Sequence, residues 1–537
     1  MADLDPAIKA LAEQIGRAED LDGAAGVLDQ MLAAAPEDFQ LLQLAGAAAF
    51  RRGDFAAAGA YFHRATHASP VDAGTRNNLG QALRAEGKFA EARAAFWRAL
   101  DLDTVFAEPA MNLGLLAAAD GDWASAVGFY AQALTRRSNY GEAHFNWAIA
   151  LERLGQAEGA VGHYRRALQF RPGYIMAINN LAALKDQEGS HGEAEALFRD
   201  GLAEATDIPE LWSGLGSNQR AQGNLAGARE AYGRALALKP DFPECRWNLA
   251  LVQLAEGDFS TGEYGGGWSN YRYRPSADRR RTPFPKAPFA PHRWPGPVDI
   301  LGEQGLGDEL FFLRFVRDLA GQGADIRYAP DPKLRTMLER LDFIKVVPAE
   351  DLTDGVSAAD LPYLMAAEAT PPSVRLDPDP AHLTAMAAKL AAAGPGPYLG
   401  LTWRAGLKQP GSLYKEIPMQ ALAGAVRDWP GTLVNLQRGP GPGEQAPPGA
   451  DFSACNDDLE DMLALMTLID RVAGVSNTNM HLRGLVGGTA AVLVTNPAEY
   501  RWMGSGTSPW FPDFHLYRQA ADGSWAGALD GLRRALI

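Results

Sequence analysis

The sequence predicts an α-helical superhelix of paired helices, followed by an α/β part made of two doubly wound halves. Two observations predict this division. A 34-residue period runs without insertion or deletion as far as residue 257, and from Pro297 onward short apolar strands alternate with glycine turns and amphipathic helices. The predicted domains are a repeat superhelix (1–262), a connector (263–296), a first α/β half (297–390) and a second α/β half (391–537).

The period is visible as columns of equivalent residues when repeats start near residues 39, 73, 107, 141, 175, 209 and 243. Positions 8 and 20 are small, as expected where two helices approach closely. Position 15 is always glycine, which predicts a left-handed residue at the end of the first helix of each pair. Position 24 is a core aromatic. In order, these columns are Gly46, Gly80, Gly114, Ala148, Ala182, Gly216 and Ala250; Ala58, Ala92, Ala126, Ala160, Ala194 and Ala228; Gly53, Gly87, Gly121, Gly155, Gly189, Gly223 and Gly257; Phe62, Phe96, Tyr130, Tyr164, Phe198 and Tyr232.

This pattern resembles the tetratricopeptide repeat over roughly residues 5 to 260. The resemblance implies helix pairs that stack into a right-handed superhelix, whose concave groove suits extended polypeptide better than it suits catalysis. We therefore expect the repeat half to bind an acceptor protein.

A column of asparagines bears on how that protein is held. Position 6 is Asn78, Asn112, Asn146, Asn180 and Asn248, interrupted by Gly214. A side-chain amide both donates and accepts hydrogen bonds, so a ladder of amides can hold the backbone of an extended chain without reading its sequence. The protein O-GlcNAc transferases resemble this arrangement. The alternative is structural, because such asparagines can also bond between neighbouring helices.

Composition narrows the classes of partner and compartment. The chain has 537 residues and a formal charge of −15, which repels nucleic acid and anionic lipid. Its two cysteines form no disulfide framework or clustered metal site, and no apolar run is long enough to span a membrane. We expect a cytoplasmic protein that binds no nucleic acid.

The α/β part is read from alternating strands and helices. The sequence of the first half predicts a strand that ends at Leu301, a helix over 308–320 and a second strand through Tyr328. The second half predicts strands near 397–402, 432–438, 471–477 and 490–495, with helices near 419–427, 459–468 and 478–486. Ligands in such sheets bind outside the carboxyl ends of the strands, so the residues that follow each strand are the candidates.

Candidates for acid–base chemistry follow the first strand. Asp308 stands after a glycine-rich turn at a helix start, where it is either a general base or an N-cap. Glu303 is its nearest substitute. The turn itself contributes Gly305 and Gly307.

Candidates for binding a nucleotide diphosphate follow the strands of the second half. Cations suit a diphosphate, and small polar residues at a helix N-terminus bind phosphate. The alternatives are a solvated charged loop for the cations and ordinary capping for the polar segment. The candidate residues are Thr402, Arg404, Lys408 and Lys415; Gln437 and Arg438; Ser476, Asn477, Thr478, Asn479 and His481. Asn456, Asp457 and Asp458 precede a helix, where capping explains them better than chemistry does.

The chain resembles bacterial tetratricopeptide proteins whose second half looks like an ADP-heptose glycosyltransferase of GT-B architecture, with two Rossmann-like halves. The segments that carry this resemblance are 303–309, 400–406, 436–440, the one around His481 and the tail 500–519. The resemblance implies an inverting, metal-independent glycosyltransferase, with Asp308 as the base. Ser476 departs from the family, which often has an aspartate there, so the donor sugar is not inherited from that family.

A sugar-nucleotide fold joined to a peptide-binding superhelix implies transfer of a sugar from a nucleotide donor to Ser or Thr of a protein, with flagellin as the nearest analogy. The alternative is a non-catalytic tetratricopeptide scaffold or chaperone with a degenerate sugar-nucleotide fold. No cofactor and no metal are expected, because the nucleotide sugar is a substrate and the two Asp-x-Asp triplets, at 101–103 and 377–379, lie in a repeat and in the expected junction.

Overall fold

The structure is a computed structural model that describes residues 6–260, 266–275, 297–302, 305–352, 355–406, 415–439, 449–496, 498–503, 506–520 and 522–536. The chain divides into two compact units, Met1–Glu204 and Ala205–Ile537. This division falls within the repeat region, so the last repeat helices belong to the second unit. Over the described residues, no helix is both long enough and apolar enough to cross a lipid bilayer.

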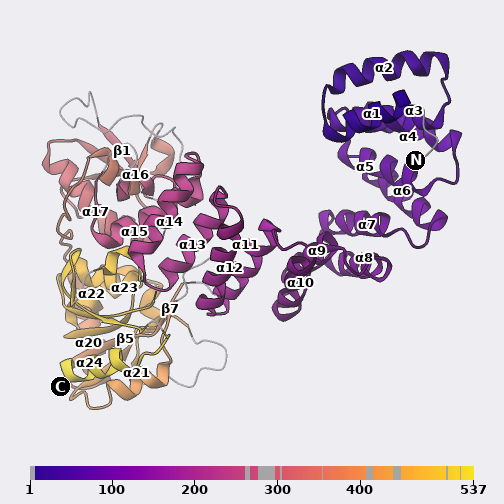
Figure 1. The fold of residues 1–537 in the computed structure, drawn as a ribbon. Coiled ribbons are helices and arrows are strands. Elements are labelled where there is room, and N and C mark those ends of the chain that lie inside the picture. The colour runs from indigo at the N-terminus through magenta and orange to yellow at the C-terminus, as the bar shows by residue number, and fades with distance from the viewer. Residues whose placement is uncertain are drawn as a thin grey trace. The chain divides into compact units, whose positions relative to one another are not determined.

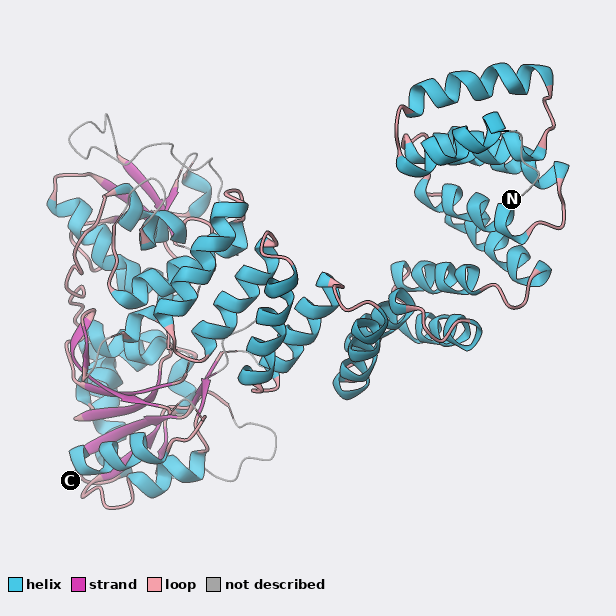
Figure 2. Ribbon diagram, viewed as in Figure 1, coloured by secondary structure: helices cyan, strands magenta, loops and turns pink. Residues whose placement is uncertain are grey.

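The first unit is a stack in which each helix packs against the next (Figures 1 and 2). The first helices of the pairs begin at residues 39, 73, 107, 141 and 175, which are the predicted repeat starts. The helices are α1 (Pro6–Arg17), α2 (Leu21–Ala34), α3 (Phe39–Arg51), α4 (Phe55–Ala68), α5 (Ala73–Ala85), α6 (Phe89–Leu102), α7 (Ala107–Ala119), α8 (Trp123–Arg136), α9 (Gly141–Arg153), α10 (Ala157–Phe170), α11 (Ile175–Gln187) and α12 (His191–Glu204).

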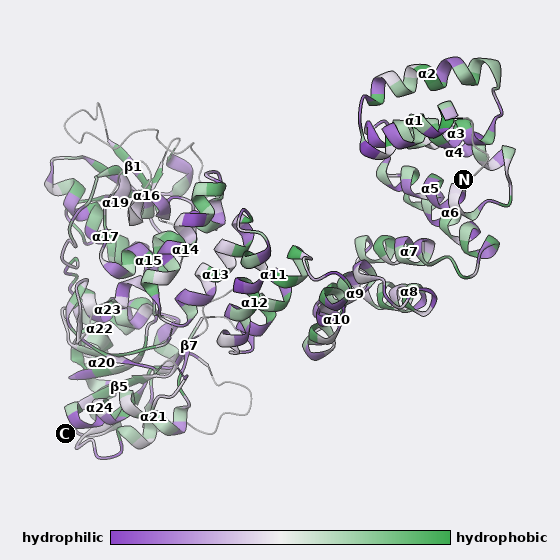
Figure 3. Ribbon diagram, in the orientation of Figure 1, coloured by the Kyte–Doolittle hydropathy of each residue, from purple (hydrophilic) through white to green (hydrophobic). Residues whose placement is uncertain are grey.

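The predicted columns have the expected structural roles. All seven position-15 glycines adopt φ between 73° and 85°, the left-handed region that favours glycine. The position-20 alanines are fully buried. A Cβ atom added to Gly46 would lie 2.6 Å from the Phe62 ring, which explains why position 8 is small opposite the position-24 aromatic. The repeat helices carry apolar and polar residues side by side (Figure 3), as expected when one face is buried.

In the second unit, the repeat continues through α13 (Pro209–Ala221), α14 (Leu225–Leu238) and α15 (Pro243–Glu256). A short helix, α16 (Gly267–Tyr271), then packs against α15 within the expected connector. Its Trp268 and Tyr271 are buried among aromatic residues of the α/β part, including Phe312 and Tyr500. The end of the repeat and the α/β part therefore share one hydrophobic core.

The first α/β half contains a parallel four-stranded sheet in the order β3-β2-β1-β4. The predicted strand–helix–strand unit is present as β1, α17 and β2. The elements are β1 (Val298–Leu301), α17 (Leu306–Gly321), β2 (Ile326–Ala329), α18 (Arg335–Leu338), β3 (Lys345–Val346), η3 (Ala349–Asp351), β4 (Val356–Ser357), η4 (Ala358–Asp360) and α19 (Leu361–Leu364).

The second half contains a seven-stranded sheet in the order β12-β13-β11-β10-β5-β8-β9, parallel except for the β12–β13 pair. Every strand and helix predicted here is present. The elements are α20 (Pro380–Ala393), β5 (Tyr398–Thr402), β6 (Arg404–Ala405), β7 (Lys415–Glu416), α21 (Met419–Ala425), β8 (Thr432–Asn435), β9 (Ala450–Asp451), η5 (Ser453–Asn456), α22 (Leu459–Leu468), β10 (Arg471–Val475), α23 (Thr478–Leu485), β11 (Ala490–Val494), η6 (Tyr500–Trp502), β12 (Thr507–Ser508), β13 (Phe511–Arg518) and α24 (Ala526–Leu536).

The strand order shows how the second sheet is wound. The strands β5, β8, β9, β10, β11 and β13 are numbered 1 to 6 in chain order, and β12 is left out. Read from β9 to β13, the sheet then has the order 3-2-1-4-5-6, which is that of doubly wound sheets that bind dinucleotides. The junction between the halves is helical, because α20 occupies 380–393 and packs on α22. Asp379, in the second Asp-x-Asp triplet, caps α20 by accepting hydrogen bonds from the N–H groups of Ala381 and His382. Turn chemistry therefore accounts for this aspartate.

Candidate functional site

The second sheet reverses its strand order between β5 and β10, which are neighbours in the sheet but distant in the chain. Doubly wound sheets bind ligands outside the carboxyl ends of their strands at such a reversal. Thr402 ends β5 and pairs with Gly474 of β10, and Ser476 directly follows β10. The topology thus brings together two of the residues that the sequence singled out.

A largely buried carboxylate, that of Glu499 with its side chain 14% exposed, connects the side chains at this edge. It forms an ion pair with Lys415 and accepts hydrogen bonds from Ser476 Oγ and Trp502 Nε1, both at 3.1 Å. Burial alone would raise the pKa of Glu499, but the nearby positive charges of Lys415 and Arg501 hold it at about 2. Lys415 also donates to the Ser476 carbonyl at 3.2 Å. The Lys415 ammonium is therefore neutralised by a protein carboxylate in this state.

Asp308 lies in the first turn of α17, but it does not cap that helix. Gly305 is the N-cap residue, and the Asp308 carboxylate forms an ion pair with Arg501 of η6 instead. Burial alone would lower the pKa of Arg501, yet the charge of Asp308 and other acidic groups raises it well above its ordinary value. The cap alternative that the sequence left open for Asp308 is therefore wrong, and its side chain instead links the first half to the loop after β11.

His481 is enclosed where the two halves meet. It is 5% exposed, and a Cβ atom added to Gly307 would lie 2.9 Å from its ring, so glycine permits this close approach. Burial and the charge of Arg501 place the pKa of His481 well below its ordinary value, so the ring is neutral. Nδ1 of His481 and Oγ1 of Thr402 are both buried and hydrogen bond to no described residue. Two orphaned polar atoms therefore lie at the sites that the sequence assigned to a donor.

The residues after β5 and β8 hold each other in place. The Gln437 side-chain oxygen accepts hydrogen bonds from the backbone N–H groups of Trp403 at 3.0 Å and Arg404 at 2.9 Å. The Arg404 guanidinium donates to the carbonyl of Gly439. Arg438 instead forms an exposed ion pair with Asp457, with 3.2 Å between the charged atoms. Gln437 and Arg404 thus shape this edge of the sheet, whereas Arg438 lies on the surface.

The polar segment before α23 is used in two ways. Asn477 caps the helix by accepting a hydrogen bond from the Met480 N–H at 3.3 Å, and Thr478 is the first helical residue. Asn479 donates to the Asn456 side chain at 3.2 Å. Capping and side-chain bonding therefore account for Asn477 and Asn479.

The asparagine column is partly engaged within the repeats. Asn112 donates to Asn77 of α5 at 3.0 Å, and Asn180 donates to the hydroxyl of Tyr164 at 3.2 Å. Asn146 donates to a carbonyl of its own helix at 2.9 Å. The amides of Asn78 and Asn248 are half-buried and hydrogen bond to no described residue. The column thus contributes bonds between and within helices and retains hydrogen-bonding capacity for a bound chain.

Two of the sequence candidates cannot be placed. Glu303, the substitute base, and Lys408, the second cation after β5, lie outside the residues that the structure describes.

Sequence reasoning missed three charged residues, Glu499, Arg501 and Glu309. The first two follow β11, so the rule that ligands gather after strands would have found them had the loop at 495–503 been inspected for charge. Glu309 is 3% exposed and accepts hydrogen bonds from the Tyr328 hydroxyl at 3.1 Å and the Asp331 N–H at 3.2 Å. Burial raises its pKa to about 7.

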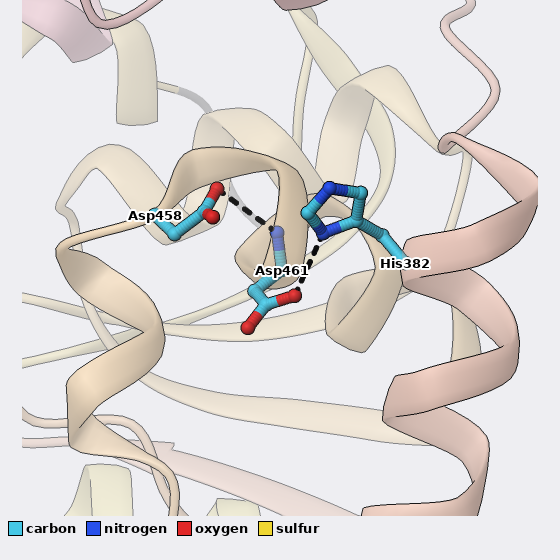
Figure 4. Close-up of side chains that lie close together, drawn as sticks. All are labelled: His382, Asp458 and Asp461. Atoms are coloured by element: carbon cyan, nitrogen blue, oxygen red, sulfur yellow. Dashed lines mark hydrogen bonds and ion pairs between the residues drawn. The ribbon is translucent and has the colours of Figure 1, made fainter.

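A group of potential metal ligands lies on α20 and α22, where His382, Asp458 and Asp461 approach one another (Figure 4). His382 Nδ1 bonds to Asp461 at 2.8 Å, and Asp458 caps α22 through the N–H groups of Glu460 and Asp461. The ammonium of Lys389 lies 3.4 Å from the same Asp461 carboxylate. These ligand atoms therefore already have protein partners, including a cation.

Comparisons with known proteins identify the repeats. A tetratricopeptide repeat model matches residues 16–73, 77–141 and 112–175, and a TPR repeat model matches 216–257. Protein FlbA from Caulobacter vibrioides is 29% identical, over 51% of this chain and 52% of that protein, so the chain spans about half the length of this curated relative.

Solved structures resemble parts of the chain. YrrB, described as a TPR protein with an unusual peptide-binding site, is 20% identical over 34% of this chain and 95% of that one, with a TM-score of 0.30. The Cut9–Hcn1 hetero-tetramer of the APC/C is 15% identical over 47% and 49%, with a TM-score of 0.39. MamA is 22% identical over 32% and 96%, with a TM-score of 0.28. By the family matches and the helical columns together, the N-terminal half of the chain consists of tetratricopeptide repeats.

Proposed function

We propose that this protein is a glycosyltransferase of GT-B architecture, which transfers a sugar from a nucleotide donor to Ser or Thr of an acceptor protein held by the repeats. The observation that carries the proposal is the reversal of strand order between β5 and β10, where Thr402, Lys415 and Ser476 gather opposite Asp308 of the first half. The Asp308–Arg501 ion pair joins the first half to the loop after β11, which also carries Glu499, and a two-Rossmann transferase would use such a junction for its substrates.

Donor binding in this proposal exchanges protein ion pairs for ion pairs to the diphosphate. Lys415 would leave Glu499 and Arg501 would leave Asp308, while the first N–H groups of α23 and the side chain of Arg404 complete the anion site. The buried hydroxyl of Thr402 lacks a partner among the described residues, which suits a hydrogen bond to the nucleotide. No metal is required for this neutralisation.

The chemistry proposed for Asp308 follows from the same exchange. An acceptor hydroxyl attacks the anomeric carbon of the donor as its proton passes to the Asp308 carboxylate. The bond between the anomeric carbon and the diphosphate oxygen breaks, and the nucleoside diphosphate leaves with its electron pair. One attack from the face opposite the leaving group inverts the configuration.

The acceptor half of the proposal rests on how the last repeats join the site. The side chain of Asn496 donates to the carbonyl of Ala221 in α13 at 3.3 Å, and α15 packs against η6, which carries Arg501. A polypeptide bound along α13 to α15 would therefore lie on helices that contact the loop of Glu499 and Arg501. A flagellin-like protein is the acceptor class that the sequence resemblance favours.

A second candidate is a protein-binding scaffold in which the sugar-nucleotide fold is catalytically inactive. The specific observation in its favour is that both Lys415 and Arg501 are already neutralised, by Glu499 and Asp308. A scaffold would use the repeats alone and would keep these ion pairs permanently.

Incubation of the full chain with a panel of nucleotide sugars separates the two candidates. A transferase should release nucleoside diphosphate from one donor. Asp308→Asn should lower that rate by at least about a hundredfold without weakening donor binding, because Arg501 is then free to pair with the diphosphate. Arg404→Ala and Lys415→Ala should weaken donor binding by calorimetry, whereas Arg438→Ala, on the surface, is the matched control. Absence of both binding and turnover across the panel would favour the scaffold.

A triple variant tests whether the asparagine column binds the acceptor protein. It combines Asn112→Ala, Asn146→Ala and Asn180→Ala. Loss of three net hydrogen bonds should weaken acceptor binding by roughly ten- to a thousandfold. Unchanged acceptor affinity would assign the column to repeat packing.

A further inference from the structure

The fourth repeat departs from its columns where α8, α9 and α10 pack together in the first unit (Figure 1). Position 7 is leucine or alanine in the other repeats but is Trp147 here. Positions 4 and 23 are histidine only in this repeat, as His144 and His163. Three unusual side chains at one place in an otherwise regular array call for a local explanation.

These side chains line a cavity of about 570 Å³. That volume lies within the range of sites that hold a small molecule or a large side chain. Glycine at 162 leaves open space where a Cβ atom would stand. The cavity is lined by Ala131, Leu134, Thr135, Ser138, His144, Trp147, Gly159, Gly162, His163 and Arg166.

The hydrogen bonds of the two histidines fix which nitrogen atoms carry protons. Burial lowers the pKa of both rings, that of His163 to about 4, so each carries one N–H near neutral pH. His144 Nε2 lies 3.2 Å from the Ser138 carbonyl, which only accepts, so His144 donates there. His144 Nδ1 is then bare and accepts from His163 Nδ1 at 3.0 Å. The remaining nitrogen, His163 Nε2, is therefore a bare acceptor, and it hydrogen bonds to no described residue.

The other polar groups of the cavity complete its pattern. The Thr135 hydroxyl donates to the carbonyl of Ala131 at 2.9 Å, so its oxygen is also left as an acceptor. Arg166 is exposed at the rim and supplies N–H donors. The Trp147 indole stacks on the His163 ring with the centroids 4.0 Å apart, which gives the cavity a flat aromatic wall, and its buried Nε1–H donates to no described residue. A fitting ligand therefore needs an apolar ring with an edge group that both donates and accepts.

We propose that this cavity binds a phenol, the side chain of a tyrosine in a partner protein. The phenol ring would pack on Trp147 and the backbone of Gly162, its hydroxyl would donate to His163 Nε2, and its oxygen would accept from Arg166. An indole N–H cannot accept, and a phenyl ring offers neither function. The site is separate from the asparagine column and gives the repeats a second point of recognition.

The full chain is titrated with p-cresol and with toluene, which has the same ring without the hydroxyl. With ¹⁵N-labelled histidine, the nine histidines of the chain give few enough signals to follow His144 and His163, which single variants assign. We expect p-cresol to bind between about two- and tenfold more tightly than toluene, as one net hydrogen bond provides, and to shift the His163 signal.

His163→Phe should reduce the preference for p-cresol, because the hydroxyl loses its acceptor and keeps only the exposed Arg166 as a partner. Phenylalanine occupies the equivalent position in the preceding repeat as Phe129, so this variant should fold. His63→Phe, on the exposed face of α4, should retain the preference. Three results would each overturn the proposal. They are equal affinities for the two probes in the unaltered chain, an undiminished preference in His163→Phe, and saturation without change at His144 and His163.

Discussion

The ion pair between Asp308 and Arg501 should couple the first α/β half to the loop after β11. The side chains are 24% and 12% exposed, so neither partner is well hydrated if the other is removed. Asp308→Asn leaves the more deeply buried cation, Arg501, with Glu499 as the carboxylate that still acts on it among the described residues. It should cost about 1–3 kcal/mol, the range for an unsatisfied group of this kind.

Arg501→Met removes the cation but retains much of the side-chain volume between Phe311 and Tyr500. Asp308 can then recover some hydration, so this variant should cost no more than Asp308→Asn. If the contact is real, the double variant should be about 1–2 kcal/mol more stable than the sum of the single effects predicts, because each charge is costly mainly when the other is absent.

Urea unfolding followed by tryptophan fluorescence measures these effects. Trp97, Trp123 and Trp147 lie in the first unit and the rest of the twelve in the second, so the signal reports mostly on the second unit. The matched control is the exposed pair Arg438–Asp457, whose side chains are 65% and 76% exposed and should show no measurable coupling. Coupling between Asp308 and Arg501 as weak as in that control would refute the reasoning.

Three further predictions concern stability. Because burial raises the pKa of Glu309 to about 7, the folded state holds more protons than the unfolded one, and stability should fall as pH rises from about 4.5 to 7; Glu309→Gln should remove this slope in urea titrations. In thermal unfolding, the Gly114→Ala variant should be less stable than the Gly128→Ala variant. Both substitutions raise helix propensity, but a Cβ atom at 114 meets an aromatic ring whereas one at 128 meets nothing within 4 Å. Equal shifts in melting temperature would contradict the packing role of position 8. Hydrogen bonding to Asp461 raises the pKa of His382, so this contact should stabilise the fold at acidic pH and lose its effect as pH rises through the folded-state pKa. The His382→Gln substitution should therefore be destabilising at pH 5 but not at pH 9, and equal effects at both pH values would contradict this role of the contact.

Local sequence determined most of the architecture. The repeat starts, the left-handed glycines and the strands of the second half follow from periods of 34 residues, 3.6 residues and 2 residues, which are properties of neighbouring positions. Thr402 and Ser476 were found in the same way, because the carboxyl ends of parallel strands necessarily share one edge of a sheet.

Partners that join distant segments could be decided only by the tertiary structure. Asp308 meets Arg501, and Lys415 meets Glu499, across separations that no periodicity encodes. The same holds for Asn112, whose amide bonds to Asn77 in the preceding repeat, and for His481, whose enclosure under Gly307 depends on how the two sheets pack. The sequence by itself therefore determined the elements and the edge at which polar residues gather, because these depend on local conformational preference. The tertiary structure decided which charges neutralise one another, because Coulomb interactions and burial depend on distance in space and not on distance along the chain.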